Sequence, residues 1–386
     1  HLSIRRQRQM CIRDRDFPNT IEFRLAETPV FVDAQTKHRL LTAGDEICSF
    51  ITSEHFIAQT EQSFQHVLTP PNEAALPECI VMDFAICKDE NNNIVPKLIE
   101  LQGFPSLFGF EWLHDKAFRQ NFEIPSGYSP YLNGYDDKKY IAHLTNIIKG
   151  NGNKHTVLLE LHPHEQKTKI DFYITQHILD IPIVCLSEIF IIENELFYKR
   201  EGVDHKIERI YNRIVWDELN KQSELMQAKG KLLLENLDIE WVTHPNHFYR
   251  ISKYTIPFFN SSAVPHTQFL SAVKTLPNDL THYVLKPLFS FAGQGVIIDV
   301  TANDIATIKD PAYWILQEKV NYAPLIATPT GDAKTEIRLF YFWDKEANKY
   351  IAILNLARLS KGKMIGVSYN ANATWVGGSL AYFEID

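Results

Sequence analysis

The chain has 386 residues, more than one hydrophobic core usually serves, so two or three cooperating domains are expected. Apolar residues make up 45% of the chain and charged residues 22%, which is ordinary for a folded globular protein and argues against disorder. The formal net charge of -8 argues against nucleic acid as the main partner, because binding a phosphate backbone needs a large basic surface.

Neither the apolar runs nor the cysteines indicate a membrane or secreted protein. No apolar run approaches the ~18 to 20 residues that a membrane span needs, so no membrane partner is expected. The five cysteines form no CxxC pair and are odd in number, which favours free thiols in a reducing compartment over a disulfide or zinc framework. We therefore expect a cytoplasmic protein, whose oligomeric state the sequence leaves open.

Residues 1–15, HLSIRRQRQMCIRDR, differ in composition from the rest of the chain. They carry five arginines, have no apolar centre and lack a small-residue cleavage site, so they do not form a secretory signal. We expect a non-native arm of translated adapter or read-through sequence. The alternative is a basic arm that binds nucleic acid.

Residues 16–120 are predicted to contain a helix near residues 46–67, followed by a hairpin. Apolar residues alternate through CIVMDFAIC and VPKLIELQG, as in half-buried strands, and the turn-forming segment KDENNN separates these two runs.

This hairpin carries a candidate metal site. Glu100 and Gln102 are two residues apart on one strand and so project from the same face, while Asp83 can lie opposite them. Three oxygen donors of this kind suit Mg²⁺, which takes one or two carboxylates and completes its shell with phosphate oxygens and water. The alternative is a solvated hairpin face, but the neighbouring LIELQGFPSLFGF is strongly apolar.

Residues 121–243 are predicted to form an α/β unit. A helix, YIAHLTNIIKG, ends on a glycine, and HTVLLELHPHEQKTKIDFYITQHILDIPIVCLSEI has the strand, helix and strand order of a βαβ unit. IFIIENELFYKR then resembles a hairpin that turns at Glu-Asn. A small parallel sheet is expected here.

The loop HPHEQKT within this unit contains metal-ligand residue types. His162, His164 and Glu165 do not have HExxH spacing, and Thr168 or Asp171 could simply cap the following helix. The loop follows a strand of the predicted parallel sheet, at the edge where α/β folds bind ligands.

Residues 244–386 are predicted to be mostly strands, and they contain a candidate phosphate site in YVLKPLFSFAGQGVIIDV. Lys286 closes one strand, and a loop of small residues precedes a second predicted strand, GVIIDV. Glycines let backbone amides turn toward an anion, and the lysine adds a full charge, so the segment could cover a triphosphate. It is not a P-loop, and the alternative is a plain hairpin. The loop residues concerned are Ser290, Gly293, Gln294 and Gly295.

Arg338 and Arg358 lie inside the apolar strands EIRLFYFW and YIAILNLARL. An unpaired charge there would be strongly unfavourable, so each arginine should have an anionic partner. We consider both a catalytic role and a structural ion pair. In the structural alternative, Glu100 is the partner of one of these arginines.

Read together, these segments resemble the circularly permuted ATP-grasp enzymes, in particular the synthetase domain of glutathionylspermidine synthase. MDFAICKDENNNIVPKLIELQGFPSL is similar to the family's metal-binding stretch, and YVLKPLFSFAGQGV to its Lys-Pro-Leu strand and nucleotide loop. The resemblance implies an α+β, permuted ATP-grasp fold. Two ATP-grasp segments, residues 16–120 and 244–386, would enclose an inserted Rossmann-like pre-ATP-grasp domain at residues 121–243.

The resemblance also implies roles for individual residues. Lys253 and Lys286 would contact the phosphates of ATP, and Arg338 would lie near the transferred phosphate. Gln102 stands where the family has Asn, and no amidase domain precedes the resembling segment, so only ligase chemistry is expected. The hinge against adenine and ribose would include Gln317, Glu318 and Val320, and Mg²⁺ would be held by Asp83, Glu100 and Gln102.

The expected activity is an ATP-dependent carboxylate–amine ligase that uses ATP and Mg²⁺ and forms an acyl phosphate. Its substrates would be a small-molecule carboxylate and an amine, neither of which the sequence identifies. One alternative is a nucleotide-binding regulator of the same fold without ligase turnover. A dinucleotide enzyme is disfavoured, because no GxGxxG opens a helix after a strand.

Overall fold

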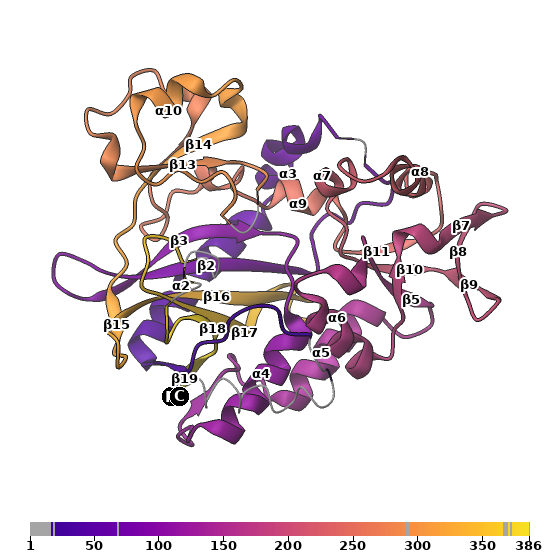
Figure 1. The fold of residues 1–386 in the computed structure, drawn as a ribbon, viewed down its shortest axis with the longest axis horizontal. Helices are drawn as coiled ribbons and strands as arrows, with labels where there is room; N and C mark the ends of the chain where they lie inside the picture. The colour runs from indigo at the N-terminus through magenta and orange to yellow at the C-terminus, as the bar shows by residue number, and fades with distance from the viewer. Residues whose placement is uncertain are drawn as a thin grey trace.

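Figure 1 shows the computed structural model of the chain, in which helices and strands are mixed throughout, as the predicted α+β class requires. The predicted arm, residues 1–15, lies outside the described residues. No helix in the described part of the chain is long and apolar enough to cross a membrane. The structure describes Phe17 and residues 20–67, 69–290, 293–365, 370 and 373–385.

The largest sheet has the strand order β18-β17-β16-β2-β3, and β15 pairs with β16 at one end of that strand. Its neighbouring strands are antiparallel. Strands from two distant parts of the sequence therefore form one sheet (Figure 1). They are β2 (Cys79–Lys88), β3 (Ile94–Gln102), β15 (Pro324–Ile326), β16 (Ala333–Asp344), β17 (Lys349–Ser360) and β18 (Gly377–Ser379).

The predicted hairpin is confirmed as β2 and β3, which pair from Val81–Gln102 to Lys88–Ile94. The expectation that both strands are half-buried is wrong for β2, whose residues are buried on both faces up to Cys87. β2 lies between β16 and β3, and its residues pack on one face of the sheet with one helix and on the other face with two further helices. The carboxylate of Asp83 on this strand is therefore isolated from bulk water, which raises the energetic importance of its partners.

The helix that covers one face of this sheet is α2 (Ala34–Ile51), and it begins earlier than the predicted start near residue 46. Asp33 caps it by accepting a hydrogen bond of 2.6 Å from the amide of Thr36. Leu40 and Ile47 of α2 pack in one core with Met82 and other apolar residues of the sheet. The separate helix α3 (Glu54–Thr60) follows.

The opposite face of the large sheet meets α4 (Phe108–Asn121). Val81 and Phe340, on neighbouring strands, share a core cluster with Phe108 of this helix. In the same cluster are residues of α5 (Asp137–Lys149), which ends at Gly150 as predicted.

The predicted βαβ unit is confirmed and belongs to a parallel sheet with the strand order β11-β10-β5-β6. Alternate residues of β5 serve opposite faces: Leu158 packs with residues of α5 and α6, whereas Leu159 packs with Met226 of α8. The elements are β5 (Thr156–Glu160), α6 (Lys169–Leu179), β6 (Ile183–Cys185), β10 (Arg209–Asn212), α7 (Trp216–Leu219), α8 (Glu224–Leu232) and β11 (Glu240–Val242).

An antiparallel sheet, β7-β8-β9, projects beside this unit at the right of Figure 1. The predicted Glu-Asn turn is confirmed, since Glu193 and Asn194 have φ of 47° and 65° between the first two strands. Positive φ at both positions matches the twist of a two-residue hairpin. The strands are β7 (Ile189–Ile192), β8 (Glu195–Arg200) and β9 (Val203–Ile207).

A third antiparallel sheet, β12-β14-β13, forms with α10 (Ala302–Thr307) the lobe at the top of Figure 1. The lobe has its own small core, which includes Leu285 and Leu316. The predicted strand GVIIDV does not form, because Ile297 makes only an isolated bridge with Leu285. The strands are β12 (Thr267–Phe269), β13 (Tyr283–Pro287) and β14 (Trp314–Glu318).

A short sheet with the order β1-β19-β4 brings the two ends of the described chain together. β1 (Val30–Val32) runs parallel to β19 (Ala381–Glu384), and β19 also pairs with β4 (Tyr128–Ser129). The predicted domain limits at residues 120 and 243 remain predictions.

Candidate functional site

A row of charged side chains crosses the face of the large sheet that lies opposite α2. Asp83 on β2 stands directly across from Arg338 on β16 and from Glu100 on β3. Residues directly opposite one another in antiparallel strands project from the same face, so the three side chains lie in one line across the sheet. A register irregularity follows Asp83 in the β2–β3 pairing.

Asp83 is the centre of this row and binds both candidate catalytic arginines. Arg338 donates from Nε to Oδ1 at 2.6 Å and from its terminal nitrogen to Oδ2 at 2.8 Å, and Arg358 also donates to Oδ2. Burial opposes ionisation of Asp83, but the two guanidinium groups outweigh it and hold its pKa below the ordinary value. Both arginines therefore have the anionic partners that their apolar strands require.

Glu336 is a further member of this charged cluster, and sequence reasoning missed it. It is directly opposite Arg358, which donates to one of its carboxylate oxygens, and the hydroxyl of Tyr322 donates to the other at 2.7 Å. Burial raises the pKa of Glu336 despite the nearby arginine. Glu336 lies two residues before Arg338, so their shared strand face was the available signal.

Glu100 pairs with Lys253, whose Nζ lies 2.7 Å from Oε1. The alternative that an arginine is its partner is wrong, since the described residues contain no hydrogen bond between Glu100 and Arg338 or Arg358. Burial opposes ionisation of Glu100, but the charge of Lys253 outweighs it and lowers its pKa. Lys253 follows the short helix α9 (Asn246–Arg250).

Two lysines connect the large sheet to the lobe above it. Lys253 also donates to the carbonyl oxygen of Ser290 at 2.5 Å. Lys286, on β13, donates to the carbonyl of Ile99 on β3 at 3.0 Å and to Oε1 of Gln317 on β14 at 2.7 Å. Burial, with Lys253 nearby, lowers the pKa of Lys286 to about 8.

The three predicted metal ligands differ in how many of their side-chain oxygens already accept hydrogen bonds from the protein. Both oxygens of Asp83 accept from guanidinium groups, whereas Glu100 has a hydrogen-bond partner at one oxygen only among the described residues. The half-buried side chain of Gln102 makes no hydrogen bond within the described ranges. Across those ranges, no three His, Cys, Asp or Glu side chains are grouped so that they could hold a metal ion. The metal role of the three residues stays a prediction.

The predicted glycine loop and hinge border the same lobe. Gly293 and Gly295 have φ of 74° and 72°, a region that favours glycine, and Gln294 between them is exposed. On β14, the side chain of Gln317 is buried. Its Nε2 donates a hydrogen bond to the hydroxyl of Thr267 at 2.9 Å, which fixes the orientation of the side-chain amide. Glu318, the last residue of β14, is exposed, and Val320 beyond the strand is half-buried.

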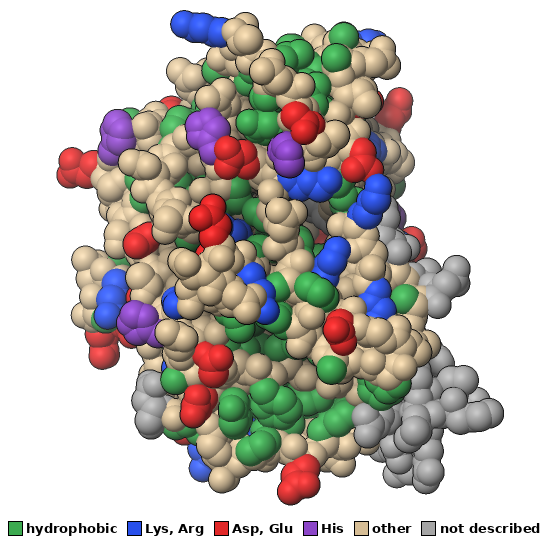
Figure 2. Space-filling model, turned by 90° about the vertical axis from the view of Figure 1, so that its left-hand side faces the viewer, with side chains coloured by type: hydrophobic (Ala, Val, Ile, Leu, Met, Phe, Trp, Pro, Cys, Tyr) green, Lys and Arg blue, Asp and Glu red, His purple; other side chains and the backbone are tan. Residues whose placement is uncertain are grey.

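On the face shown in Figure 2, Lys and Arg side chains gather across the middle of the molecule, below the lobe that carries α10. Apolar side chains lie lower on the same face. Asp and Glu side chains lie among these cationic groups, so the face carries charges of both signs.

The comparisons with known proteins bear on the fold. The sequence matches no protein-family model and no curated protein. It is similar in structure to a glutathione synthetase-like effector from Globodera pallida in its apo form, with a TM-score of 0.56 and 12% identity, over 100% of this chain and 96% of the effector chain. The two proteins share a fold. At this identity, the likeness concerns the arrangement of helices and strands alone.

The HPHEQKT loop has a structural explanation in part. His164 contacts the hydroxyl of Tyr173 at 2.8 Å. Neither expected cap operates on α6: Thr168 makes no side-chain cap bond, and Asp171 accepts instead from the amides of Leu107 and Phe110 at the start of α4. Asp171 therefore joins α6 to α4, a long-range contact that the local sequence did not indicate.

Proposed function

We propose that this chain is an ATP-dependent carboxylate–amine ligase of the permuted ATP-grasp type, with ATP bound between the large sheet and the lobe above it. One observation carries the proposal: Lys253 and Lys286 both bridge these two layers. Lys253 pairs with the carboxylate of Glu100, whose charge also acts on Lys286. Two ammonium groups at one junction favour a polyanionic ligand there.

The order of the elements supports the permuted type. The β2–β3 hairpin comes before the strand that bears Lys286, and the parallel-sheet unit lies between them in the sequence. In the proposal this unit is the Rossmann-like pre-ATP-grasp domain. The shared fold with a protein named as glutathione synthetase-like supports a ligase-type scaffold.

In the proposed site, the two lysines hold the phosphates of ATP together with the loop residues Ser290, Gly293, Gln294 and Gly295. The strand end from Gln317 to Val320 forms the hinge beside the adenine and ribose. Arg338 and Arg358 offset the charge on the transferred phosphoryl group, and Asp83 keeps both guanidinium groups oriented through the contacts described above.

The residues present fit a Mg²⁺ ion that needs few protein ligands. Glu100 offers one carboxylate oxygen without a hydrogen-bond partner among the described residues, and Gln102 offers an amide oxygen two residues along the strand. Asp83 could contribute only if an arginine moved away. When bound, Mg²⁺ would help to neutralise the phosphate oxygens.

The reaction would proceed in two steps. A substrate carboxylate oxygen attacks the γ-phosphorus of ATP, the bond to the β-phosphate oxygen breaks, and an acyl phosphate and ADP form. An amine then attacks the acyl carbon, inorganic phosphate leaves with the bonding electrons, and the amine proton passes to solvent. The cationic side chains stabilise charge in the first step, and no acidic nucleophile from the protein is needed.

One observation favours the alternative of a nucleotide-binding regulator without turnover. Both oxygens of Asp83 are committed to guanidinium groups, so this carboxylate is better placed to orient arginines than to bind a metal ion. A regulator would bind ATP but would not consume it.

Thermal denaturation with ATP, ADP and NAD, each with and without Mg²⁺, tests the proposal, because a ligand that binds the native state raises its apparent stability. We expect stabilisation by ATP and ADP but not by NAD. ADP release is then measured with panels of carboxylates and amines. Substrate-dependent release supports a ligase, ATP binding without release supports the regulator, and no response to either nucleotide contradicts both.

A further inference from the structure

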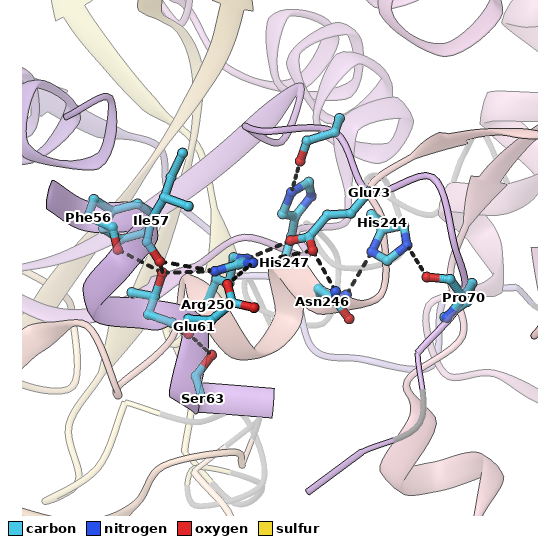
Figure 3. Close-up of polar contacts among 12 residues, drawn as sticks. Phe56, Ile57, Glu61, Ser63, Pro70, Glu73, His244, Asn246, His247 and Arg250 are labelled. Atoms are coloured by element: carbon cyan, nitrogen blue, oxygen red, sulfur yellow. Dashed lines mark hydrogen bonds and ion pairs between the residues drawn. The ribbon is translucent and has the colours of Figure 1, made fainter. Parts of the chain in front are cut away.

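We propose that Glu73 is a positioning residue that holds helix α9 at both ends and thereby places Lys253 in the site. Figure 3 shows the contacts of this carboxylate. Glu73 accepts from Nδ2 of Asn246, the first residue of α9, at 2.7 Å, and from Nε of Arg250, the last residue, at 2.5 Å. The role rests on the proposed nucleotide function of Lys253.

The guanidinium of Arg250 is held on several sides. It donates a second hydrogen bond to Glu73 at 3.3 Å and one to Glu61 at 2.8 Å, and it reaches Thr60 of α3 at 3.3 Å. Its plane lies over the ring of Phe64, 4.5 Å from the ring centroid. Only 7% of the Arg250 side chain is exposed, so the loss of its main carboxylate partner would leave a charge largely desolvated.

Two histidines of the same segment bind the chain around Glu73. Nε2 of His244 contacts the carbonyl of Pro70 and Nε2 of His247 that of Ala74, both at 3.1 Å (Figure 3). Because carbonyl oxygens only accept, both Nε2 atoms carry the hydrogen. The segment from Pro70 to Ala74 therefore serves as a backing strip for α9.

A short turn transmits the position of α9 to Lys253. The hydroxyl of Thr255 donates to the carbonyl of Arg250 at 2.5 Å, and its amide donates to the carbonyl of Ser252 at 3.1 Å. These bonds close the turn around Lys253, so a displacement of Arg250 displaces the lysine.

The other side of α9 rests directly on the end of β3. The amide of Gly103 donates to the carbonyl of Ile251 at 2.7 Å, and a Cβ atom added at Gly103 would lie 2.5 Å from the carbonyl oxygen of His247. α9 is thus clamped between the strip at Glu73 and the strand that carries Glu100. This clamp sets the distance between Lys253 and Glu100.

A double-mutant cycle with Glu73→Gln and Lys253→Met tests this role, with ATP affinity measured by calorimetry. In the wild-type background we expect Glu73→Gln to weaken ATP binding by about tenfold, as a displaced positioning contact can. In the Lys253→Met background it should leave ATP affinity unchanged while still lowering the melting temperature. Equal losses of affinity in both backgrounds would reduce Glu73 to a purely structural residue and overturn the proposal.

Glu61→Gln is the matched control, because Glu61 also pairs with Arg250 but makes no contact with Asn246 among the described residues. We expect a much smaller change of ATP affinity in this variant. An effect as large as that of Glu73→Gln would contradict a clamp that depends on both ends of α9.

Chemical labelling provides a test without nucleotide. The rate of reductive methylation of Lys253, followed by mass spectrometry, should rise in Glu73→Gln, because the amine leaves Glu100 and the Ser290 carbonyl, and should stay unchanged in Glu61→Gln. If the wild-type protein binds no ATP, the proposed function fails and the labelling rates alone decide the positioning role. An unchanged rate in a folded Glu73→Gln protein would overturn it.

Discussion

Arg338 forms two hydrogen bonds with Asp83 across a pair of antiparallel strands, at 2.6 and 2.8 Å, and both side chains are almost fully buried. Arg358 adds a third bond to the same carboxylate. A buried ion pair of this kind is far more sensitive to the loss of one partner than its net contribution to stability suggests, because the remaining charge is left desolvated.

Asp83→Asn should therefore lower the free energy of unfolding by about 3 to 5 kcal/mol, since two buried guanidinium groups lose their shared carboxylate. Urea denaturation followed by circular dichroism measures the change. Glu240→Gln is the control: Glu240 pairs with Lys154 and Arg209 at a more exposed position, and its loss should cost at most about 1 kcal/mol. Comparable losses in both variants would contradict a special role for the buried cluster.

ATP affinity should fall as the pH rises, and the fall should begin at a lower pH than the titration of an exposed lysine would produce. The pKa of Lys286 is lowered to about 8, so its positive charge disappears between about pH 7 and about pH 9. Calorimetry across this range should show a fall in ATP affinity that adenosine does not share. Lys286→Arg keeps the charge and should remove the pH dependence, whereas Lys286→Met should weaken ATP far more than adenosine. A similar fall in adenosine affinity would contradict the assignment of Lys286 to the phosphate site.

Deprotonation of Lys286 should affect the stability of the fold in the opposite direction: the free energy of unfolding should rise with pH where ATP affinity falls. The folded pKa of Lys286 lies below the ordinary value of 10.5, so the folded state binds fewer protons than the unfolded state between these values. The contribution of Lys286 to the free energy of unfolding should therefore increase from about pH 8 to about pH 10.5 and then level off. In Lys286→Met this increment should vanish, as a comparison of urea midpoints at several pH values will reveal.

Glu100→Gln should separate metal binding from nucleotide binding. The substitution keeps the shape of the side chain but removes a negative charge, so Mg²⁺ should no longer strengthen ATP binding and most of the turnover should be lost. Affinity for metal-free ATP should be retained or raised, because Lys253 loses its counter-charge. ATP affinity is measured with and without Mg²⁺, together with ADP release. An intact Mg²⁺ dependence in a destabilised variant would exclude Glu100 as a metal ligand.

Gly103→Ala should destabilise the protein by about 1 to 3 kcal/mol, because the added methyl group has no room against α9. Its Cβ would lie 2.5 Å from the carbonyl oxygen of His247 and 2.7 Å from Cβ of Ile251. Gly127→Ala is the control, since a Cβ there meets nothing within 4 Å. Thermal denaturation of the two variants gives the comparison, and equal melting temperatures would argue against the close approach of α9 to β3.

Several elements could be predicted from the sequence because their signals are local. The alternation in residues 79–103 and the polar turn between the two runs predicted the β2–β3 hairpin, which is confirmed. Likewise the Glu193-Asn194 turn and the βαβ unit follow from short patterns of apolar, turn-forming and helix-forming residues. The strand expected at GVIIDV is the counterexample: β-branched residues alone did not make it a strand, and it forms one bridge only.

The partners of the charged residues were decided by the tertiary structure. The sequence by itself required that Arg338 and Arg358 have anionic partners, but Asp83 and Glu336 reach them only through the register of β16 against its two neighbours. Register between distant strands depends on packing of the whole sheet, and a slip of one residue would turn every side chain to the other face. For the same reason, the sequence could name Glu100 and Lys253 only as candidate site residues, whereas their pairing depends on how α9 packs against the end of β3.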